Sequence, residues 1–293
     1  MATHVPVLLA EALELLAVKP GGFYVDGTVG LGGHAEAVLE RSSPDGRLLA
    51  IDRDEDALAL ARERLQRFGA RVAVAHDDWR ALPERLGAER PDGVLLDMGV
   101  SSLQFDVAER GFSFRNDGPL DMRMDRSRGE TAAEVLSDIP ENELADVLFT
   151  LGEERRSRRV ARAIVAARAK APLETTVALA QVVRRAIGRV PHGIDSATRS
   201  FQALRLFVNR ELEGVGAAFQ KIARTLAPGG RLVVIAFHSL EDREVKQAFR
   251  ALAGPEFALL TKKPLVPGDD EVRANPRSRS AKLRAIERRE EAA

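Results

Sequence analysis

The strongest fold signal in this sequence lies in Phe23-Tyr24-Val25-Asp26-Gly27-Thr28-Val29-Gly30-Leu31-Gly32-Gly33-His34. The mostly apolar residues 23–26 predict a short buried strand, and a helical pattern over residues 35–41 follows the glycines. Glycines at such a turn let the backbone approach a ligand closely, and they present the N–H groups of the helix N-terminus to it. The segment therefore predicts a ligand-binding turn after the first strand of an α/β sheet.

A second predicted strand, residues 47–52, ends in Asp52, twenty residues beyond Gly32. A carboxylate at this place can accept hydrogen bonds from both ribose hydroxyls of an adenosine cofactor. The alternative is a tight strand–helix turn with an incidental aspartate. The joint occurrence of the glycines and Asp52 favours the cofactor.

The identity of that cofactor depends on the neighbouring residues. The spacing Gly30-x-Gly32-x-x-Ala35 also satisfies the dinucleotide fingerprint, so an NAD-dependent oxidoreductase is one alternative. Asp26 favours S-adenosylmethionine, because a carboxylate suits the ammonium of that cofactor better than it suits a pyrophosphate. Trp79, after a third predicted strand, is a candidate to stack on adenine, and its alternative is ordinary core packing.

The wider pattern predicts a mostly parallel sheet with an insertion. Short apolar strands at 72–74 and 94–97 alternate with helical segments such as 54–67, which is typical of a sheet covered on both faces. No buried strand is evident between about 106 and 207, and the strand pattern returns at 231–237. We expect residues 1–105 and 208–293 to form one α/β domain and residues 106–207 to form an inserted helical domain.

Composition excludes several classes of protein. The 293 residues include no cysteine, which excludes disulfides, thiolate metal sites and cysteine nucleophiles. The sequence lacks a signal-peptide core and a membrane-spanning apolar run, so a soluble cytoplasmic protein is the expectation. Lys+Arg and Asp+Glu both number 44, yet residues 151–170 and 272–286 are locally basic. A neutral protein with such stretches can bind a polyanion on one face.

Two further strand ends carry candidate site residues. The fourth predicted strand ends in Asp97, without the Asp/Asn-Pro-Pro-aromatic motif that amino-group methyltransferases usually have there. His238 directly follows the strand 231–237, the usual place for a site residue in such sheets, and its alternative is a histidine satisfied by neighbouring backbone. We expect Asp97 and His238 to be catalytic and no metal to take part.

Seven blocks, in order along nearly the whole chain, resemble one bacterial family, the 16S rRNA cytosine-N4 methyltransferases (ribosomal small subunit methyltransferase H). After an opening His4-Val5-Pro6-Val7-Leu8, they are Asp26-Gly27-Thr28…Gly32-Gly33-His34, Asp97-Met98-Gly99-Val100-Ser101-Ser102-x-Gln104, Arg110-Gly111-Phe112-Ser113-Phe114, Gly118-Pro119-Leu120-Asp121-Met122-Arg123-Met124, Gln202-Ala203-Leu204-Arg205-x-Phe207-Val208-Asn209, Phe237-His238-Ser239-Leu240-Glu241-Asp242-Arg243 and Asn275-Pro276-Arg277-Ser278-Arg279-Ser280-Ala281-Lys282-Leu283-Arg284. Thr28 stands where the common methyltransferase loop has its first glycine, which indicates a particular branch.

The resemblance implies a class I methyltransferase fold (α/β, Rossmann-like, mostly parallel sheet) with an inserted all-helical domain that recognises substrate. It implies methylation of N4 of one cytidine in the decoding region of 16S rRNA, within the 30S subunit or an assembly intermediate. The implied S-adenosylmethionine contacts are Gly32, Gly33, His34, Asp52, Trp79, Asp97 and Gln104, in addition to Asp26. At Trp79 the family often has phenylalanine.

The C-terminal basic residues and the proton acceptor each allow two interpretations. We expect Arg277, Arg279, Lys282 and Arg284 to bind RNA phosphates, and a merely solvated tail is the alternative. The acceptor of the amine proton is Asp97 or a carbonyl near Gly99. A non-catalytic RNA-binding protein is a second rival to the enzyme, but such a protein is expected to have lost the glycines or Asp52. The oligomeric state is undecided, with a homodimer among the candidates.

Overall fold

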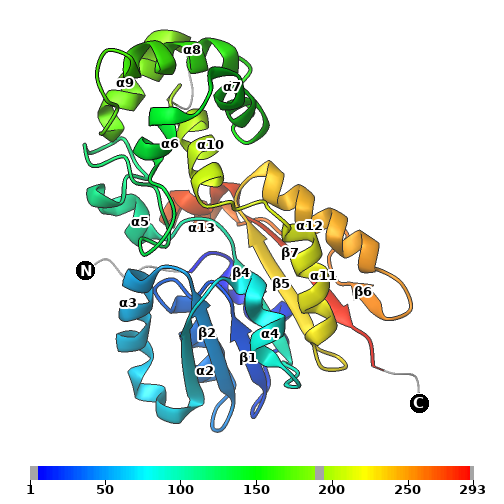
Figure 1. Ribbon diagram of the computed structural model, residues 1–293. Coiled ribbons are helices and arrows are strands. Elements are labelled where there is room, and N and C mark those ends of the chain that lie inside the picture. The colour runs from blue at the N-terminus through cyan, green and yellow to red at the C-terminus, as the bar shows by residue number, and fades with distance from the viewer. Residues whose placement is uncertain (1–5, 189–194, 291–293) are drawn as a thin grey trace. The chain divides into compact units, whose positions relative to one another are not determined.

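The computed structural model describes residues 6–188 and 195–290, and these divide into two compact units (Figure 1). Unit 1 comprises Met1–Gly99 and Gly214–Ala293, and unit 2 comprises Val100–Glu213. His4 and Val5 of the opening family block lie outside the described residues. No helix in the described ranges is long and apolar enough to cross a membrane.

Unit 1 is built on a seven-stranded sheet with the strand order β3-β2-β1-β4-β5-β7-β6. The first five strands are parallel to their neighbours. They are β1 (Phe23–Asp26), β2 (Arg47–Asp52), β3 (Val72–His76), β4 (Gly93–Asp97) and β5 (Arg231–Ala236). All five strands predicted from apolar runs are therefore confirmed, β1 and β2 to the residue.

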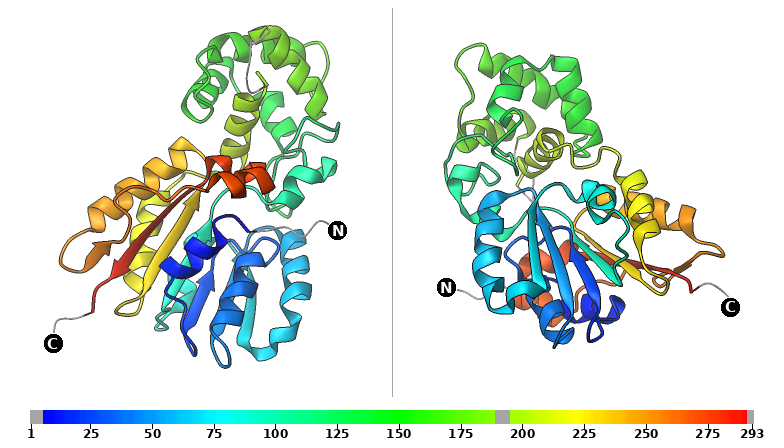
Figure 2. Two further views of the ribbon diagram at one scale, coloured as in Figure 1. Left: turned by 180° about the vertical axis from the view of Figure 1, so that it is seen from behind. Right: turned by 60° about the horizontal axis from the view of Figure 1, so that its bottom comes forward.

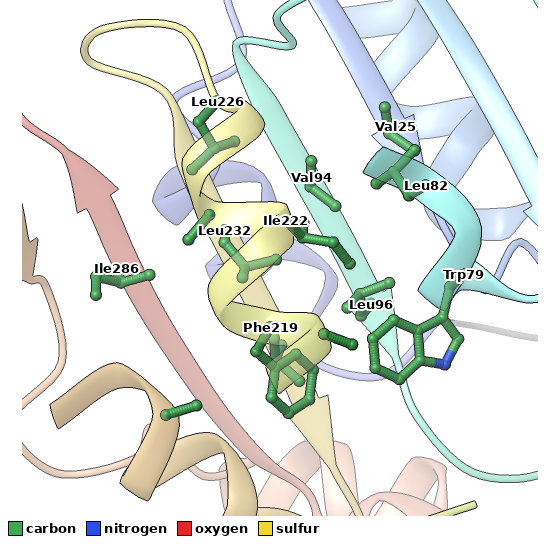
Figure 3. Packing of buried hydrophobic residues seen from close by; sticks show 14 of the residues in the cluster. Val25, Trp79, Leu82, Val94, Leu96, Phe219, Ile222, Leu226, Leu232 and Ile286 are labelled. Atoms are coloured by element: carbon green, nitrogen blue, oxygen red, sulfur yellow. The ribbon is translucent and has the colours of Figure 1, made fainter. Parts of the chain in front are cut away.

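Helices cover both faces of this sheet, and each central strand divides its side chains between two cores. Val94 and Leu96 of β4 pack on one face with α4 (Leu82–Leu86), α11 (Val215–Thr225) and α12 (Ser239–Leu252) (Figure 3). Leu95, between them, packs on the other face with α1 (Leu9–Leu15), α2 (Gly33–Arg41) and α3 (Glu55–Leu65). Burial on both faces explains why these strands are continuously apolar instead of alternating.

The remaining two strands, β6 (Phe257–Leu259) and β7 (Lys282–Arg288), are not evident from the apolar pattern. β7 pairs antiparallel with both β5 and β6, and Figure 2 shows it (red) beside β5 (yellow). β7 extends to Glu287 and Arg288, close to the end of the described residues. The short α13 (Asp269–Ala274) and the 3₁₀ segment η4 (Pro276–Ser280) lie between β6 and β7 in sequence.

The described residues of unit 2 form helices and connecting loops, with one isolated β-bridge between Pro119 and Thr175. Its helices are α5 (Ser102–Asp106), α6 (Ala132–Asp138), α7 (Glu141–Thr150), α8 (Ser157–Arg168), α9 (Thr176–Ile187) and α10 (Thr198–Val208), with η3 (Ala108–Arg110). They enclose a hydrophobic core of their own. Asn209 joins two family blocks here, since its Oδ1 accepts from Met124 N (2.7 Å) and its Nδ2 donates to the Met122 carbonyl (2.7 Å).

Candidate active site

The site of unit 1 is defined by the reversal of strand order between β1 and β4. From β1 the chain continues to β2 and β3 on one side, while β4 and β5 lie on the other. Ligands of open α/β sheets bind beyond the carboxyl ends of the strands at such a switch point. Here the three strands β2, β1 and β4 all end in an aspartate: Asp52, Asp26 and Asp97.

The glycine turn fits closely between β1 and α2. Gly32 is the N-cap residue of α2 with φ of +80°, a left-handed conformation that other residues adopt at a cost. A Cβ on Gly33 would lie 2.5 Å from the Pro6 ring, so this position also excludes a larger side chain. The turn is fixed to β2 by a bond from Val29 N to the Ile51 carbonyl (2.9 Å).

Thr28 has a role that the sequence alone did not indicate. Its Oγ1 accepts a hydrogen bond from the backbone N–H of Asp97 at 2.6 Å. The hydroxyl thus ties the glycine turn after β1 to the end of β4, which a glycine cannot do. The threonine at position 28, where the common loop has a glycine, therefore links the ends of β1 and β4.

Asp52 is held by two backbone donors. Gly30 N donates to Oδ2 at 2.8 Å and Asp54 N to Oδ1 at 2.9 Å. Burial raises the pKa of Asp52 above its ordinary value, and these two hydrogen bonds oppose the rise. Each oxygen has a second lone pair, so the carboxylate can still accept from a ligand hydroxyl.

Asp26 is 2% exposed, and among described residues its Oδ1 accepts from Thr28 N at 3.2 Å. Burial, with a smaller contribution from the charge of Asp52, raises the pKa of Asp26 to about 7. The Thr28 hydrogen bond opposes this shift. Near neutral pH the ligand-free protein therefore holds Asp26 only partly ionised, and a cation beside it would favour the charged form.

Asp97 faces His34, the first side chain after the two glycines. Its Oδ2 lies 3.6 Å from His34 Nδ1, while His34 Nε2 is 3.0 Å from the Val7 carbonyl. A carbonyl oxygen only accepts, which assigns the Nε2 proton and turns Nδ1 toward the carboxyl group. Burial, followed by the charges of Asp26 and Glu241, raises the pKa of Asp97 well above its ordinary value. Its Oδ1 is buried and has no hydrogen-bond partner in residues 6–188 and 195–290.

His238 lies at the carboxyl end of β5, the strand next to β4, where Asp97 is in register with Ile235. It is the N-cap residue of α12, and its Nδ1 accepts from Glu241 N at 3.4 Å. Glu241 is fully buried; its Oε1 lies 3.1 Å from His238 Nε2, and its Oε2 accepts from Phe237 N at 2.8 Å. Glu241 thus orients the histidine ring, a role that sequence analysis did not assign.

Two predicted cofactor residues lie in more ordinary surroundings. Trp79 is 6% exposed, and its indole stacks on Phe219 with ring centres 5.3 Å apart, so most of the ring belongs to the core (Figure 3). Gln104 is in unit 2, where its Oε1 accepts from Ser101 N (3.0 Å) in a capping box that begins α5.

The four predicted RNA-binding cations divide into two pairs. Arg277 and Arg279 lie in η4 and are exposed. Lys282 and Arg284 lie in β7 and both reach Asp242 of α12: Arg284 Nε is 2.6 Å from Oδ1, and Lys282 Nζ is 3.5 Å from Oδ2. Burial raises the pKa of Asp242, but Arg284 and Lys282 outweigh it and hold that pKa below its ordinary value. This pair therefore joins α12 to β7.

The residues of the candidate active site are mainly acidic. Three aspartates with raised pKa values end adjacent strands of unit 1 around a glycine turn, with His34 beside one of them. No group of three or more potential ligand side chains in the described part of the chain could hold a metal ion. Such a site suits an organic cation that also carries hydroxyl groups.

The comparisons with known proteins agree with this chemistry. The family model described as the MraW methylase family matches residues 1–289. The chain is 50% identical to the ribosomal RNA small subunit methyltransferase H of Nitrobacter winogradskyi, over 99% of this chain and 92% of that protein. It is 52% identical to the protein of the same name from Sorangium cellulosum, over 97% and 90% of the two chains.

The fold also has a counterpart among solved structures. A crystal structure titled as a putative rRNA-methylase from Clostridium thermocellum matches 97% of this chain and 99% of its own, with a TM-score of 0.50. At 12% sequence identity this likeness concerns the fold alone. It agrees with the predicted α/β methyltransferase class.

Proposed function

Because the chain belongs to the MraW methylase family, we propose that it transfers a methyl group from S-adenosylmethionine to N4 of one cytidine in the decoding region of 16S rRNA. The family membership confirms the resemblance seen in the seven sequence blocks. The observation that carries the proposal is the row of aspartates, Asp52, Asp26 and Asp97, at the carboxyl ends of β2, β1 and β4.

The residues of this site fit S-adenosylmethionine. That molecule carries an ammonium and a sulfonium, and three carboxyl groups with raised pKa values favour a positively charged ligand. The buried Asp97 Oδ1, which lacks a hydrogen-bond partner among the described residues, is an acceptor available to it. The same carboxyl groups would repel the pyrophosphate of NAD, which argues against the oxidoreductase.

Each candidate residue has a part in this proposal. Asp52 binds the ribose hydroxyls, Asp26 binds the ammonium, and the turn formed by Gly32 and Gly33 lies against the ligand. Trp79, although largely buried, is the proposed contact for adenine. The other proposed cofactor contacts are His34, Asp97 and Gln104, and the proposed catalytic residues are Asp97 and His238.

The protein's task is mainly positioning. The N4 of cytosine is a weak nucleophile, because its lone pair is delocalised into the ring, and the methyl donor supplies a carbon that is already strongly electrophilic. Aligning the reacting atoms about 3–3.5 Å apart can contribute roughly 7–11 kcal/mol. Asp97 or a carbonyl near Gly99 accepts the hydrogen bonds of the amine and then its proton. The base is presented unstacked, since a paired cytosine has its amine buried.

The proposal extends to the domains and partners. Residues 1–105 and 208–293 hold the donor, and the inserted residues 106–207 recognise rRNA. The substrate is 16S rRNA in the 30S subunit or an assembly intermediate, which places the reaction in the cytoplasm. A homodimer is one candidate state, and light scattering of the purified protein distinguishes it from a monomer.

The decisive experiment is methyl transfer itself. The protein is incubated with labelled S-adenosylmethionine and, in separate reactions, with naked 16S rRNA, 30S particles and 70S particles, and the modified nucleoside is mapped. We expect N4-methylcytidine at one decoding-region position in at least one of these substrates. Label in another nucleoside, or in none of the three substrates, would refute the proposed function.

Replacing Asp52 tests the cofactor site. We expect Asp52→Ala to lose about 1.5–3 kcal/mol of S-adenosylmethionine affinity, the usual worth of a hydrogen bond to a charged group. Isothermal calorimetry measures this, with wild-type protein and exposed Asp45→Ala as references. Unchanged affinity would remove Asp52 from the site.

Replacing two arginines of the C-terminal segment separates RNA binding from stability. Arg284→Ala leaves the carboxylate of Asp242 with the more distant Lys282, whose Nζ is 3.5 Å away, and we expect it to cost about 3 kcal/mol of unfolding free energy. Arg279→Ala removes an exposed cation, so the free energy of unfolding should stay unchanged. The slope of log affinity for rRNA against log salt concentration should fall in magnitude by about 0.7–0.9. Denaturant titration and binding at several salt concentrations measure the two effects, and the reverse result would contradict the assignment.

A further inference from the structure

Four exposed arginines of unit 2 lie at or near the N-terminal end of α8 (Ser157–Arg168). Arg158, Arg159 and Arg162 belong to the first two turns of α8, and Arg155 precedes the helix by two residues. Arg162 is three residues from Arg159 and four from Arg158, so these three side chains lie on the same side of the helix, and Arg155 lies just before it in sequence. We call these four residues the arginine face.

The arginine face is not required for packing. The opposite side of α8 carries Val160, Ala161 and Ile164, which are fully buried in the core of unit 2. All four arginines are exposed, and the Arg162 side chain retains 77% exposure. Their charge is therefore directed to solvent, and the helix is held by its apolar side.

The positive charge of the arginine face is hardly neutralised by carboxylates of the described residues. Arg155, Arg158 and Arg159 make no ion pair or side-chain hydrogen bond within residues 6–188 and 195–290, and Arg162 is 3.6 Å from Glu141, which is itself exposed. Elsewhere exposed arginines have closer partners, such as Arg47 with Glu89 at 2.7 Å.

The local electrostatics make this concentration of charge unfavourable without an anion. The buried carboxylate of Glu154 accepts from Arg156 N at 2.8 Å and offsets part of the positive charge of this helix end, but α8 has no acidic residue in its first turn. Two arginines in that turn repel both one another and the helix end. An anionic ligand on the face would relieve this repulsion.

We propose that the arginine face binds the phosphate backbone of RNA, and this rests on the proposed function in rRNA methylation. Arginine presents a planar fork of donors that matches phosphate oxygens, and it is less strongly hydrated than lysine. All four residues of the arginine face are arginines, so the face itself contains no aromatic ring that could stack on a base. It therefore supplies affinity and orientation without reading sequence.

The test compares two quadruple variants with equal change in net charge. The first converts the arginine face to glutamine (Arg155, Arg158, Arg159 and Arg162→Gln). The matched control converts four arginines that pair with carboxylates, Arg47, Arg67, Arg184 and Arg224→Gln. Binding of 16S rRNA is measured by filter retention between 50 and 250 mM salt, roughly the range in which phosphate contacts change affinity most visibly.

We expect the first variant to bind rRNA at least about tenfold more weakly near 0.15 M salt, and its logarithmic salt slope to fall by about 3. The control should lose less than one unit of slope. S-adenosylmethionine affinity by calorimetry should stay unchanged in both variants. Equal slopes in the two variants, or a wild-type slope in the first, would overturn the proposal.

A third variant with lysine at the same four positions covers the case in which the glutamine variant folds poorly. It should keep the wild-type slope, because charge is retained, and lose severalfold in affinity, because the donor fork is lost. Polyglutamate as competitor tests an acidic protein instead: competition as strong as that of RNA of equal charge would overturn the RNA assignment. Failure of the proposed function is separate, since it appears as absence of methyl transfer by the wild-type protein.

Discussion

Asp26→Asn is expected to make the ligand-free protein more stable at pH 8 while it loses most of its affinity for S-adenosylmethionine. The asparagine keeps the acceptor for Thr28 N and removes only the charge. In the wild-type protein that charge is buried, at 2% exposure, near the carboxylate of Asp52. Folding at pH 8 therefore buries an ionised carboxyl group in a place that disfavours its charge, and the proposed contact with the ammonium of the methyl donor would offset that cost.

The pH dependence of this effect has a definite sign. The pKa of Asp26 rises from 3.8 to about 7 on folding. A group whose pKa is raised on folding stabilises the folded protein at pH values below its unfolded-state pKa. This contribution is lost as the pH rises through about 7. At about 1.36 kcal/mol per unit, the variant should exceed the wild type by up to about 4 kcal/mol above pH 8 and by almost nothing below pH 4.

Urea titrations at pH 4 and at pH 8 measure the difference, and Asp45→Asn, at an exposed position, is the control. Calorimetry in buffers of different ionisation enthalpy gives the second readout. Wild-type protein should release protons on binding the donor near pH 6.5, because the cation favours ionised Asp26, and any binding by the variant should release fewer. A stability difference that is the same at both pH values would show that Asp26 is already ionised in the free protein.

Asp97→Asn is expected to abolish most methyl transfer while the protein stays folded. The tie to the glycine turn survives, because Thr28 Oγ1 accepts from the backbone N–H of residue 97 and not from its side chain. If Asp97 holds the target amine, kcat should fall by at least about a hundredfold, the usual worth of a positioned proton acceptor. If it serves the ammonium instead, KM for the donor should rise and kcat should be largely spared.

His238→Ala separates the remaining alternatives at this edge of the sheet. A large fall in kcat, with unchanged donor affinity, supports positioning of the base or removal of its proton. Wild-type kinetics would return His238 to its structural role as the N-cap of α12. Glu241→Gln keeps the cap acceptors and removes the charge beside the ring, so it should reproduce part of the His238→Ala effect only if the histidine acts in catalysis.

The parallel part of the sheet could be predicted because its strands have a simple sequence signature. β1, β2, β4 and β5 are buried on both faces and are therefore nearly continuous apolar runs. β7 lacks that signature, since basic residues alternate with apolar ones along it. Its Arg284 is buried by a pairing with Asp242, forty-two residues earlier in the chain, which no local pattern reveals.

The strand-end aspartates were found for the same reason, since each directly follows an apolar run. Thr28 and Glu241 were not, because what they do depends on contacts. The hydroxyl of Thr28 meets the end of β4, and Glu241 belongs to a capping box whose N-cap is a histidine instead of the usual Ser, Thr, Asp or Asn. Both lie inside family blocks, so the blocks marked the right segments without giving these roles.

The strand connectivity also sets the order in which a newly synthesised chain can fold. Residues 100–213 form one uninterrupted unit with its own core, so they can pack while the rest is still being made. β4 has no partner on one side until β5 is synthesised, after the whole helical unit, and β5 then lacks its second neighbour until residues 282–288 follow. For that interval the nascent chain carries an open, apolar strand edge, the kind of surface that chaperones protect from aggregation. A chain stopped near residue 213 should thus contain a folded helical unit attached to an unfinished, aggregation-prone sheet.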